Sequence, residues 1–347
     1  MDKPLVSIII PIYNGEKYID NIFECFSKWE RKDIEVFLID DGSSDNSFKL
    51  IREKALKDSR FNALKKDNGG IADSRNYGMK HARGRYFYFC DQDDYVDTDV
   101  LDEIILCLEN GKYDFCMANY ATIQNGNKKE HIIIDKRTEI GKRDALNLSK
   151  WLIGNGTIEC GNVPHIGSTV WCCLFQKNFL KSNNILFEKF IDYEDDWVFL
   201  IKCLIGADKI LLENKILYYW NVNDSSESHK NKYVDRFYEN RVELKKFIDD
   251  VLDKMQVPIK DRKRFEVMFQ RRTLLWNLYN ECYRKGSLKD KIRNIQMYTE
   301  IELEKARYNL INKSYSTKEN ILLMFLMRRC YYLSYLMNKI CFKFHFH

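Results

Sequence analysis

Hydrophobic positions in the first two hundred residues fall into short continuous runs separated by amphipathic segments. The apolar runs lie at residues 5–10, 35–39 and 86–90. Runs of this length without alternation are typical of strands buried on both faces of a parallel sheet. The segments at 18–29 and 47–56 have helical spacing instead. This alternation predicts βαβ units, and therefore an α/β domain with a doubly wound, Rossmann-like, mostly parallel sheet.

The pattern changes after residue 207. From Asp208 to His347, the two residues that most often interrupt helices occur only once each, as Gly286 and Pro258. An apolar run at 210–220 predicts one more strand, and the rest is predicted to be helical. Asn125-Gly126 at the centre of residues 120–134 predicts a hairpin. We therefore expect two domains, an α/β domain at residues 1–225 and a helical extension at 226–347.

Composition indicates a globular protein whose two parts differ in charge. The chain is 45% hydrophobic with a mean hydropathy of -0.47. Its net charge of +5 combines -6 for residues 1–230 with +11 for residues 231–347.

The N-terminal apolar run has only about eight residues between two prolines, too few for a membrane span. The 11 cysteines include no Cys-x-x-Cys, which is typical of buried thiols in a reducing compartment. We therefore expect a cytoplasmic protein.

Carboxylates follow two of the predicted strands. Asp40 and Asp41 come directly after the second apolar run, and Asp91 and Asp93 follow the third. Because parallel strands end at one edge of a sheet, these groups are expected to converge and to need a compensating cation. A hard divalent ion, Mg²⁺ or Mn²⁺, fits Asp91 and Asp93 and leaves positions for phosphate oxygens. The Walker loop, the Rossmann glycine fingerprint and the zinc-type His-Glu-x-x-His motif are absent from the sequence.

Two further segments carry candidate chemistry. Residues 67–78 contain paired glycines, which permit a close backbone approach, and Arg75, which supplies a cation. Residues 192–197 place several acids at the start of an apolar helical run. A carboxylate at a helix N-terminus is stabilised in its ionised form, which suits a general base.

Four blocks in this order resemble a family 2 glycosyltransferase with the GT-A fold, of the kind that builds bacterial capsules and other surface polysaccharides. The blocks are VSIIIPIYNGEKYI, FLIDDGSSDNS, KKDNGGIADSRNYGMKHARGRYFYFCDQDDYVDTDVL and YEDDWVF. The resemblance covers roughly residues 4–225. It implies a metal-dependent, inverting transfer of a sugar from a nucleotide sugar, a UDP-hexose or a UDP-N-acetylhexosamine, to a hydroxyl of a growing lipid-linked glycan.

The resemblance also implies roles for individual residues. Asp195 would be the catalytic base and Glu194 would position the acceptor, although the neighbouring Asp196 leaves the base ambiguous by one residue. Mn²⁺ or Mg²⁺ would be held by Asp91 and Asp93, with His229 as a further candidate ligand. The residues implied to contact the nucleotide sugar are Pro11, Tyr13, Asn14, Asp40, Asp41, Asn68, Gly69, Arg75, Asp91 and Gln92.

The basic tail has a pattern of its own. On a single helix, Lys318, Arg328, Arg329, Lys339 and Lys343 would share an arc of roughly 100° opposite an apolar and aromatic side. This predicts a helix that lies on an anionic membrane, at the inner face of the plasma membrane, where a polyprenyl-diphosphate-linked oligosaccharide acceptor would be reached. The alternative is that the apolar side packs on the catalytic domain or on a second copy in a homo-oligomer. Nucleic-acid binding is disfavoured, because acids lie where a polyanion would bind.

Two other functions are alternatives to glycosyl transfer. A sugar nucleotidyltransferase would need a loop rich in Gly and Arg or Lys after the first strand, and residues 11–17 do not supply one. A non-catalytic nucleotide- or glycan-binding subunit would keep the pocket without turnover, and the presence of Asp195 argues against it.

Overall fold

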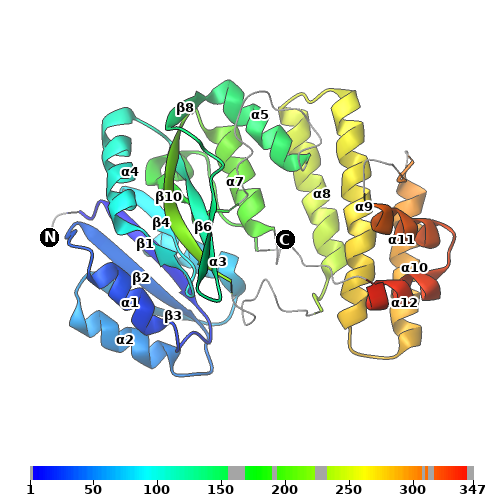
Figure 1. Cartoon of the computed structure of the whole chain (residues 1–347), viewed down its shortest axis with the longest axis horizontal. Helices are drawn as coiled ribbons and strands as arrows, with labels where there is room; N and C mark the ends of the chain where they lie inside the picture. The colour runs from blue at the N-terminus through cyan, green and yellow to red at the C-terminus, as the bar shows by residue number, and fades with distance from the viewer. Residues whose placement is uncertain are drawn as a thin grey trace. The chain divides into compact units, whose positions relative to one another are not determined.

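The structure is a computed structural model, and it describes residues 3–154, 169–189, 194–222, 233–306, 309–311 and 316–341. The chain divides into two compact units (Figure 1). The N-terminal unit comprises Met1–Leu152 and Cys160–Asn223, and the C-terminal unit comprises Ile153–Glu159 and Asp224–His347.

One sheet organises the N-terminal unit. Its first half is parallel, in the order β3-β2-β1-β4, and its second half continues β9-β6-β10-β5. Strand β9 runs antiparallel to both β4 and β6, whereas β6 and β10 are parallel to each other. The α/β class is confirmed, and the sheet is mixed beyond β4. The strands are β1 Val6–Ile12, β2 Ile34–Asp41, β3 Phe61–Lys66, β4 Tyr86–Phe89, β5 Tyr95–Val96, β6 Phe115–Gln124, β7 Asn127–His131, β8 Thr138–Gly141, β9 Cys173–Gln176 and β10 Lys209–Asn221.

The hydrophobic runs become strands because both faces of the sheet are covered. Every residue of β2 is buried, and so are six of the seven residues of β1. Helix α3 packs closely on these two strands, since a Cβ on Gly78 would lie 2.5 Å from Ile9 and 2.7 Å from Ile39. The predicted hairpin is confirmed as β6 and β7, with Asn125 and Gly126 at φ of 51° and 78°.

Helices of the N-terminal unit follow the strands in βαβ order. They are α1 Ile19–Ser27, α2 Ser47–Lys57, α3 Gly70–His81, α4 Thr98–Gly111, α5 Lys142–Ile153, α6 Lys177–Ser182 and α7 Asp195–Gly206. Helix α7 is anchored by Phe199, which stacks on Phe187 at 4.0 Å between ring centroids and meets Phe89 edge-on at 5.8 Å. This aromatic packing fixes the start of α7 at the same sheet edge as the end of β4.

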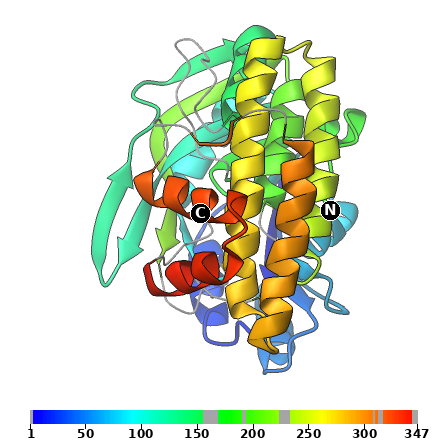
Figure 2. The ribbon, with the colours of Figure 1, turned by 90° about the vertical axis from the view of Figure 1, so that its right-hand side faces the viewer.

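The described part of the C-terminal unit is helical. Figure 2 shows the long helices α8, α9 and α10 side by side, with the short helices α11 and α12 against them. Their bounds are α8 Phe237–Lys254, α9 Ile259–Tyr283, α10 Leu288–Lys305, α11 Thr317–Met327 and α12 Tyr331–Cys341. A buried cluster that includes Leu278, Ile295, Leu322 and Tyr335 joins α9, α10, α11 and α12. In the described part of the chain, no helix combines the length and the hydropathy needed to cross a bilayer.

The prediction of one continuous basic helix in the tail is wrong. Helix α11 ends at Met327, and Arg329 takes a left-handed conformation with φ of 59°. The N–H of Cys330 donates to Phe325 C=O at 2.9 Å and that of Arg329 to Leu326 C=O at 2.9 Å, which is the Schellman arrangement that closes a helix. The break lets α12 bury Tyr331 and Tyr335 in the cluster. The cations of the proposed arc therefore lie on separate segments, and Lys343 lies outside the described residues.

Candidate active site

The loop after β1 is hydrogen-bonded to the loop after β2. Asn14 donates its N–H to Ser43 Oγ at 2.9 Å and accepts at Oδ1 from the N–H of Ser44 at 2.9 Å. Gly15 N–H donates to Ser47 Oγ at 2.9 Å. Asn14 has a φ of 46°, a conformation that asparagine tolerates better than most residues. Asn14 thus shapes the sheet edge through contacts within the protein.

Gln92 connects the loop after β4 to the same edge. Its Oε1 accepts from the N–H of Tyr13 at 3.0 Å, and its Nε2 donates to the C=O of Tyr13 at 3.2 Å. A Cβ on Gly15 would lie 2.2 Å from Gln92 Oε1, so a side chain there would displace the Gln92 amide from this position. Gln92 therefore positions the backbone at Tyr13, whose side chain is 45% exposed next to Pro11 at the end of β1.

Asp40 is fully buried at the end of β2, yet neither of its carboxylate oxygens has a hydrogen-bond partner among the described residues. The Nζ of Lys65 lies 3.9 Å from Oδ2. A buried acceptor without a donor is costly, commonly by about 1–3 kcal/mol. Asp40 is thus suited to receive an N–H or O–H from a ligand.

Asp41 makes its contacts inside the protein. Its oxygens accept from the N–H groups of Gly69 at 2.9 Å and Gly70 at 2.8 Å, at the start of α3, and from the ammonium group of Lys66. Asn68 Nδ2 donates to the C=O of Asp41 at 2.9 Å. Asp41 therefore holds the loop that carries Asn68 and Gly69 against the end of β2.

Asp94 holds the acidic turn after β4, a role that the sequence did not reveal. The hydroxyl of Tyr218 donates to Asp94 Oδ2 at 2.6 Å, and Asn221 N–H donates to Oδ1 at 2.7 Å. Burial, together with the neighbouring charges of Asp93 and Asp91, raises the pKa of Asp94 well above its ordinary value. The carboxylate of Asp94 is therefore buried and also repelled by the other acids of the turn.

Arg75 brings three carboxylates together. It is almost fully buried, and its Nη2 lies 2.9 Å from Asp91 Oδ1. Its Nη1 lies 3.0 Å from Asp195 Oδ2 and 2.5 Å from Asp196 Oδ1. Burial opposes the charge of the guanidinium, but Asp196, Asp91 and Asp195 together outweigh that effect and raise the pKa of Arg75. Residues from the ends of β4 and the start of α7 thereby form one charged network.

Asp195 and Asp196 differ in how the protein uses their oxygens. Asp196 contacts Arg75 through Oδ1 and accepts from the N–H of Val170 at 3.2 Å through Oδ2. The contact of Asp195 to Arg75 is made through Oδ2 alone. Burial first, then repulsion from Asp196 and Asp91, raises the pKa of Asp195 to about 7 in spite of Arg75. Glu194 occupies the N-cap position of α7, immediately before this pair.

The described residues contain no group of three or more His, Cys, Asp or Glu side chains able to hold a metal ion by themselves. His229 lies outside them, as do residues 190–193. The donor set at the turn nevertheless fits a hard cation. Asp91 and Asp93 offer carboxylate oxygens two residues apart, and their charges add to the effect of burial in raising the pKa of Asp94, a repulsion that Mg²⁺ or Mn²⁺ would relieve.

Comparisons with known proteins identify this class of fold. The structure of Staphylococcus aureus TarS 1-349 in complex with UDP-GlcNAc matches with a TM-score of 0.64 over 96% of this chain and 90% of that chain, at 19% identity. The N-terminal unit therefore has the GT-A fold. The model of glycosyl transferase family 2 matches residues 7–161. This match, together with the relatives below, confirms the predicted resemblance to family 2 glycosyltransferases.

Curated relatives agree with this family. An uncharacterized glycosyltransferase, EpsJ of Bacillus subtilis, is 28% identical over 64% of this chain and 62% of its own length. The poly(ribitol-phosphate) beta-N-acetylglucosaminyltransferase TarS of Staphylococcus aureus is 23% identical over 67% of this chain and 38% of its own length. The chain thus spans less than two thirds of these relatives.

Proposed function

We propose that the chain is an inverting glycosyltransferase that moves a hexosyl or N-acetylhexosaminyl group from a UDP-sugar to a hydroxyl of a growing surface glycan. The observation that carries the proposal is the network around Arg75. It joins Asp91, at the predicted diphosphate end of the site, to Asp195, the predicted base. The UDP-GlcNAc complex of TarS, a protein of the same fold, supports the choice of a UDP-sugar.

The donor would bind along the edge formed by the ends of β1, β2 and β4. The unpartnered oxygens of Asp40 are suited to accept an N–H from the nucleotide base. The exposed ring of Tyr13 supplies an aromatic surface for that base, and the loop at Asn68 and Gly69 lies beside it. When bound, Mg²⁺ or Mn²⁺ at Asp91 and Asp93 would supply positive charge opposite the diphosphate.

Asp195 would take the proton from the acceptor hydroxyl. The resulting oxygen nucleophile forms a bond to the anomeric carbon while the bond to the nucleoside diphosphate breaks, so that a single displacement inverts the configuration. The N-terminus of α7 favours the ionised form of Asp195, and Arg75 holds its carboxylate in place. Glu194, at the N-cap, would orient the acceptor.

The test is release of nucleoside diphosphate from a panel of UDP- and GDP-sugars, with MnCl₂ and a membrane extract as the source of acceptor. The proposal expects release from a UDP-sugar that depends on the extract. Release of pyrophosphate in an incubation with UTP and a sugar phosphate would favour a sugar nucleotidyltransferase instead. Absence of turnover with every donor would favour a binding subunit.

The pH profile should follow the base. Because the pKa of Asp195 is raised to about 7, the carboxylate is largely protonated below that value and cannot accept a proton. We expect kcat/KM, which reports the pKa of the free enzyme, to rise as the pH increases through about 7 and then to level off. A profile that is flat from pH 5.5 to 8.5 would contradict the assignment of Asp195 as the base.

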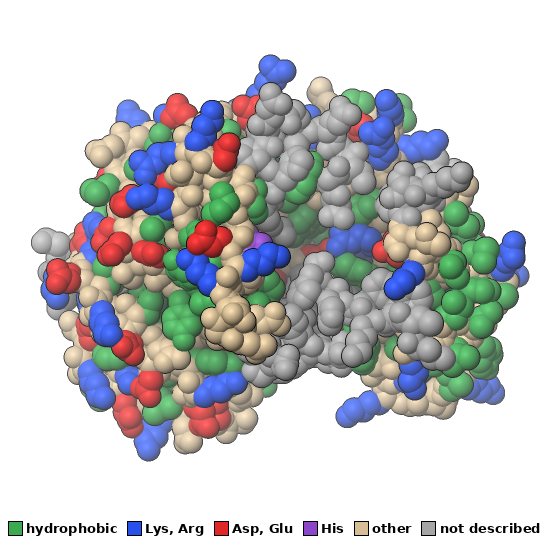
Figure 3. Space-filling model, viewed as in Figure 1, with side chains coloured by type: hydrophobic (Ala, Val, Ile, Leu, Met, Phe, Trp, Pro, Cys, Tyr) green, Lys and Arg blue, Asp and Glu red, His purple; other side chains and the backbone are tan. Residues whose placement is uncertain are grey.

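The acceptor would be reached at the inner face of the plasma membrane. On α12, Tyr332, Leu333 and Leu336 are 60%, 42% and 51% exposed. The sequence contains no Asp or Glu from residue 320 to residue 347, whereas Arg328, Arg329 and Lys339 are exposed cations. Figure 3 shows hydrophobic side chains gathered on the surface of the C-terminal helices. Apolar and aromatic groups among cations favour an anionic lipid surface. A lipid-linked, polyprenyl-diphosphate acceptor would meet the enzyme there.

Substitution on the outer face of α12 tests this contact. We expect the double variant Leu333→Asp/Leu336→Asp to lose sedimentation with phosphatidylglycerol vesicles, because it replaces apolar contact with repulsion. The control is Leu106→Asp, at a residue of α4 that is 57% exposed. Unchanged sedimentation of the double variant would refute the membrane contact. A loss of self-association instead, measured by analytical ultracentrifugation, would identify the face as a homo-oligomer interface.

A further inference from the structure

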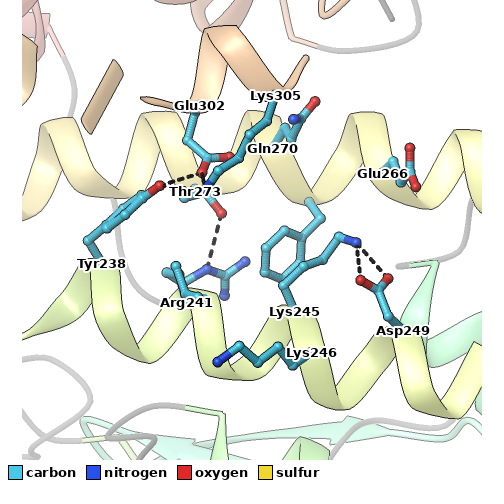
Figure 4. A pocket seen from close by; sticks show the side chains of 12 residues that line it. Tyr238, Arg241, Lys245, Lys246, Asp249, Glu266, Gln270, Thr273, Glu302 and Lys305 are labelled. Atoms are coloured by element: carbon cyan, nitrogen blue, oxygen red, sulfur yellow. Dashed lines mark hydrogen bonds and ion pairs between the residues drawn. The ribbon is translucent and has the colours of Figure 1, made fainter. Parts of the chain in front are cut away.

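A pocket of about 340 Å³ lies inside the C-terminal unit, where α8, α9 and α10 meet (Figure 4). This volume is in the range of small-molecule sites, which begin at roughly 300 Å³. The residues that line it come from one face of each helix. They are Tyr238, Arg241, Val242, Lys245, Lys246, Asp249, Glu266, Phe269, Gln270, Thr273, Glu302 and Lys305.

Most residues that line this pocket carry a polar or charged group, although carbon atoms of their side chains make up the larger part of its surface. Only Val242 and Phe269 among its residues carry purely hydrocarbon side chains. Four of the residues with polar groups are buried, with exposed fractions of 8% for Tyr238, 4% for Arg241, 2% for Thr273 and 7% for Glu302. Helices in a bundle ordinarily meet through close-packed apolar side chains. A polar recess at a junction of three helices is therefore a departure that a ligand would explain.

Several of these polar groups are held in place before any ligand arrives. The hydroxyl of Tyr238 donates to Glu302 Oε1 at 2.7 Å, and Lys305 Nζ donates to the oxygen of Tyr238 at 3.1 Å. Arg241 Nε lies 3.3 Å from Thr273 Oγ1, and its guanidinium lies 4.2 Å from the centre of the Phe269 ring. Fixed donors and acceptors lower the entropic cost of binding.

Two polar groups face the pocket without a partner. Glu266 and Gln270 lie one turn apart on α9, and in the described part of the chain neither side chain has a hydrogen bond or ion pair. Lys245, on the facing helix α8, is already paired with Asp249 at 2.5 Å. A carboxylate and an amide side by side offer three acceptor oxygens and two N–H donors to a ligand.

The mixture of charges narrows the class of ligand. An anion would meet the carboxylates of Asp249, Glu266 and Glu302, and a cation would meet one arginine and three lysines. An apolar molecule would leave the polar groups of the lining desolvated and unpaired. A hydroxyl group both donates and accepts hydrogen bonds. A ligand with several hydroxyl groups can therefore pair with the carboxylates and with the cationic side chains of the pocket.

We propose that this pocket is a saccharide-binding site, separate from the donor site of the N-terminal unit. Glu266 and Gln270, on α9, bind the hydroxyl groups of one sugar ring, and Arg241, on α8, lies on the facing wall. In a glycosyltransferase such a site holds the acceptor glycan through a sugar other than the one that reacts. The role in holding the acceptor rests on the proposed function, whereas the binding of a saccharide in this pocket does not.

Saturation-transfer NMR on the full chain tests the site with methyl glycosides of glucose, galactose and N-acetylglucosamine, with UDP in excess. We expect at least one glycoside to bind, and we expect Glu266→Ala/Gln270→Ala to weaken its affinity by about tenfold, as the loss of two hydrogen bonds predicts. The control is Glu304→Ala, at an exposed residue of α10 outside the pocket. Thermal unfolding of both variants should match that of the parent chain.

A photoreactive version of the bound glycoside localises the site, and it should label peptides within residues 238–305. Absence of binding by every glycoside, or equal affinity in the double variant, would overturn the proposal. Labelling confined to the N-terminal unit would overturn it as well. Glycoside binding without release of nucleoside diphosphate from any donor would refute the proposed function and leave this site standing.

Discussion

Asp195→Asn should reduce kcat by about a thousandfold while the KM for the donor changes little. A general base contributes roughly 10²–10⁴ to the rate, and asparagine keeps the size of the side chain but cannot accept the proton. Asp195 is buried beside Arg75, so bulk water does not readily take its place as the proton acceptor. The measurement is the steady-state release of UDP at pH 8, where the parent carboxylate is ionised.

The fold should survive this change. Because burial raises the pKa of Asp195 from its ordinary value to about 7, the ionised carboxylate destabilises the folded state relative to the neutral one. The stability that the protonated Asp195 contributes to the folded state is fully present below its ordinary pKa. It is lost as the pH rises through about 7. Asp195→Asn removes the penalty, so its unfolding midpoint at pH 8 should equal or exceed that of the parent.

Asp196→Asn separates the two candidate bases. Asp196 accepts hydrogen bonds from Arg75 at Oδ1 and from the N–H of Val170 at Oδ2. This variant should therefore lower the free energy of unfolding more than Asp195→Asn does. It should retain most of the turnover. If Asp196→Asn abolished activity and Asp195→Asn did not, the base would be Asp196.

Local patterns were sufficient for most of the elements. The apolar runs at residues 5–10, 35–39 and 86–90 correspond to β1, β2 and β4, and the Asn125-Gly126 turn lies between β6 and β7. These signals are local, because burial on two faces and a left-handed turn each select particular residue types. The antiparallel direction of β9 could not be predicted from the sequence, because it depends on pairing with β4 and β6, which are distant along the chain.

The site was predicted less completely, for two physical reasons. Arg75 and Asp195 are 120 positions apart, and no spacing rule relates a guanidinium to carboxylates at that separation. Asp94 resembles its acidic neighbours in the sequence, and only its burial against Tyr218 separates its structural role from theirs. The break at Arg329 escaped prediction because the left-handed position that ends a helix is usually glycine.

Arg75→Gln should abolish detectable turnover and lower the free energy of unfolding by about 3–5 kcal/mol at pH 8. The loss follows from removing one partner of a buried ion pair, which leaves the remaining charges uncompensated. Here three carboxylates, those of Asp91, Asp195 and Asp196, would lose their shared cation. Chemical denaturation at fixed pH measures the effect.

The pH dependence of this loss identifies its cause. Without Arg75, repulsion and burial raise the pKa values of Asp195 and Asp196 further, so the folded state of the variant binds protons that the unfolded state has released. Protonation then restores stability as the pH falls, and the difference from the parent chain should shrink between pH 8 and pH 5. A difference that stayed constant over this range would mean that Arg75 acts through packing on Phe187 rather than through charge.

Arg85→Gln is the matched control. Arg85 forms an ion pair with Glu109 at 3.0 Å but is 52% exposed, and such surface pairs contribute about 0–1 kcal/mol. Arg75→Lys supplies a second comparison, because lysine keeps the positive charge without the two-armed geometry that reaches Asp91 and the α7 acids together. It should recover most of the stability and little of the activity. Full recovery of both would show that charge alone, and not the joining of the two acidic segments, is what the site requires of Arg75.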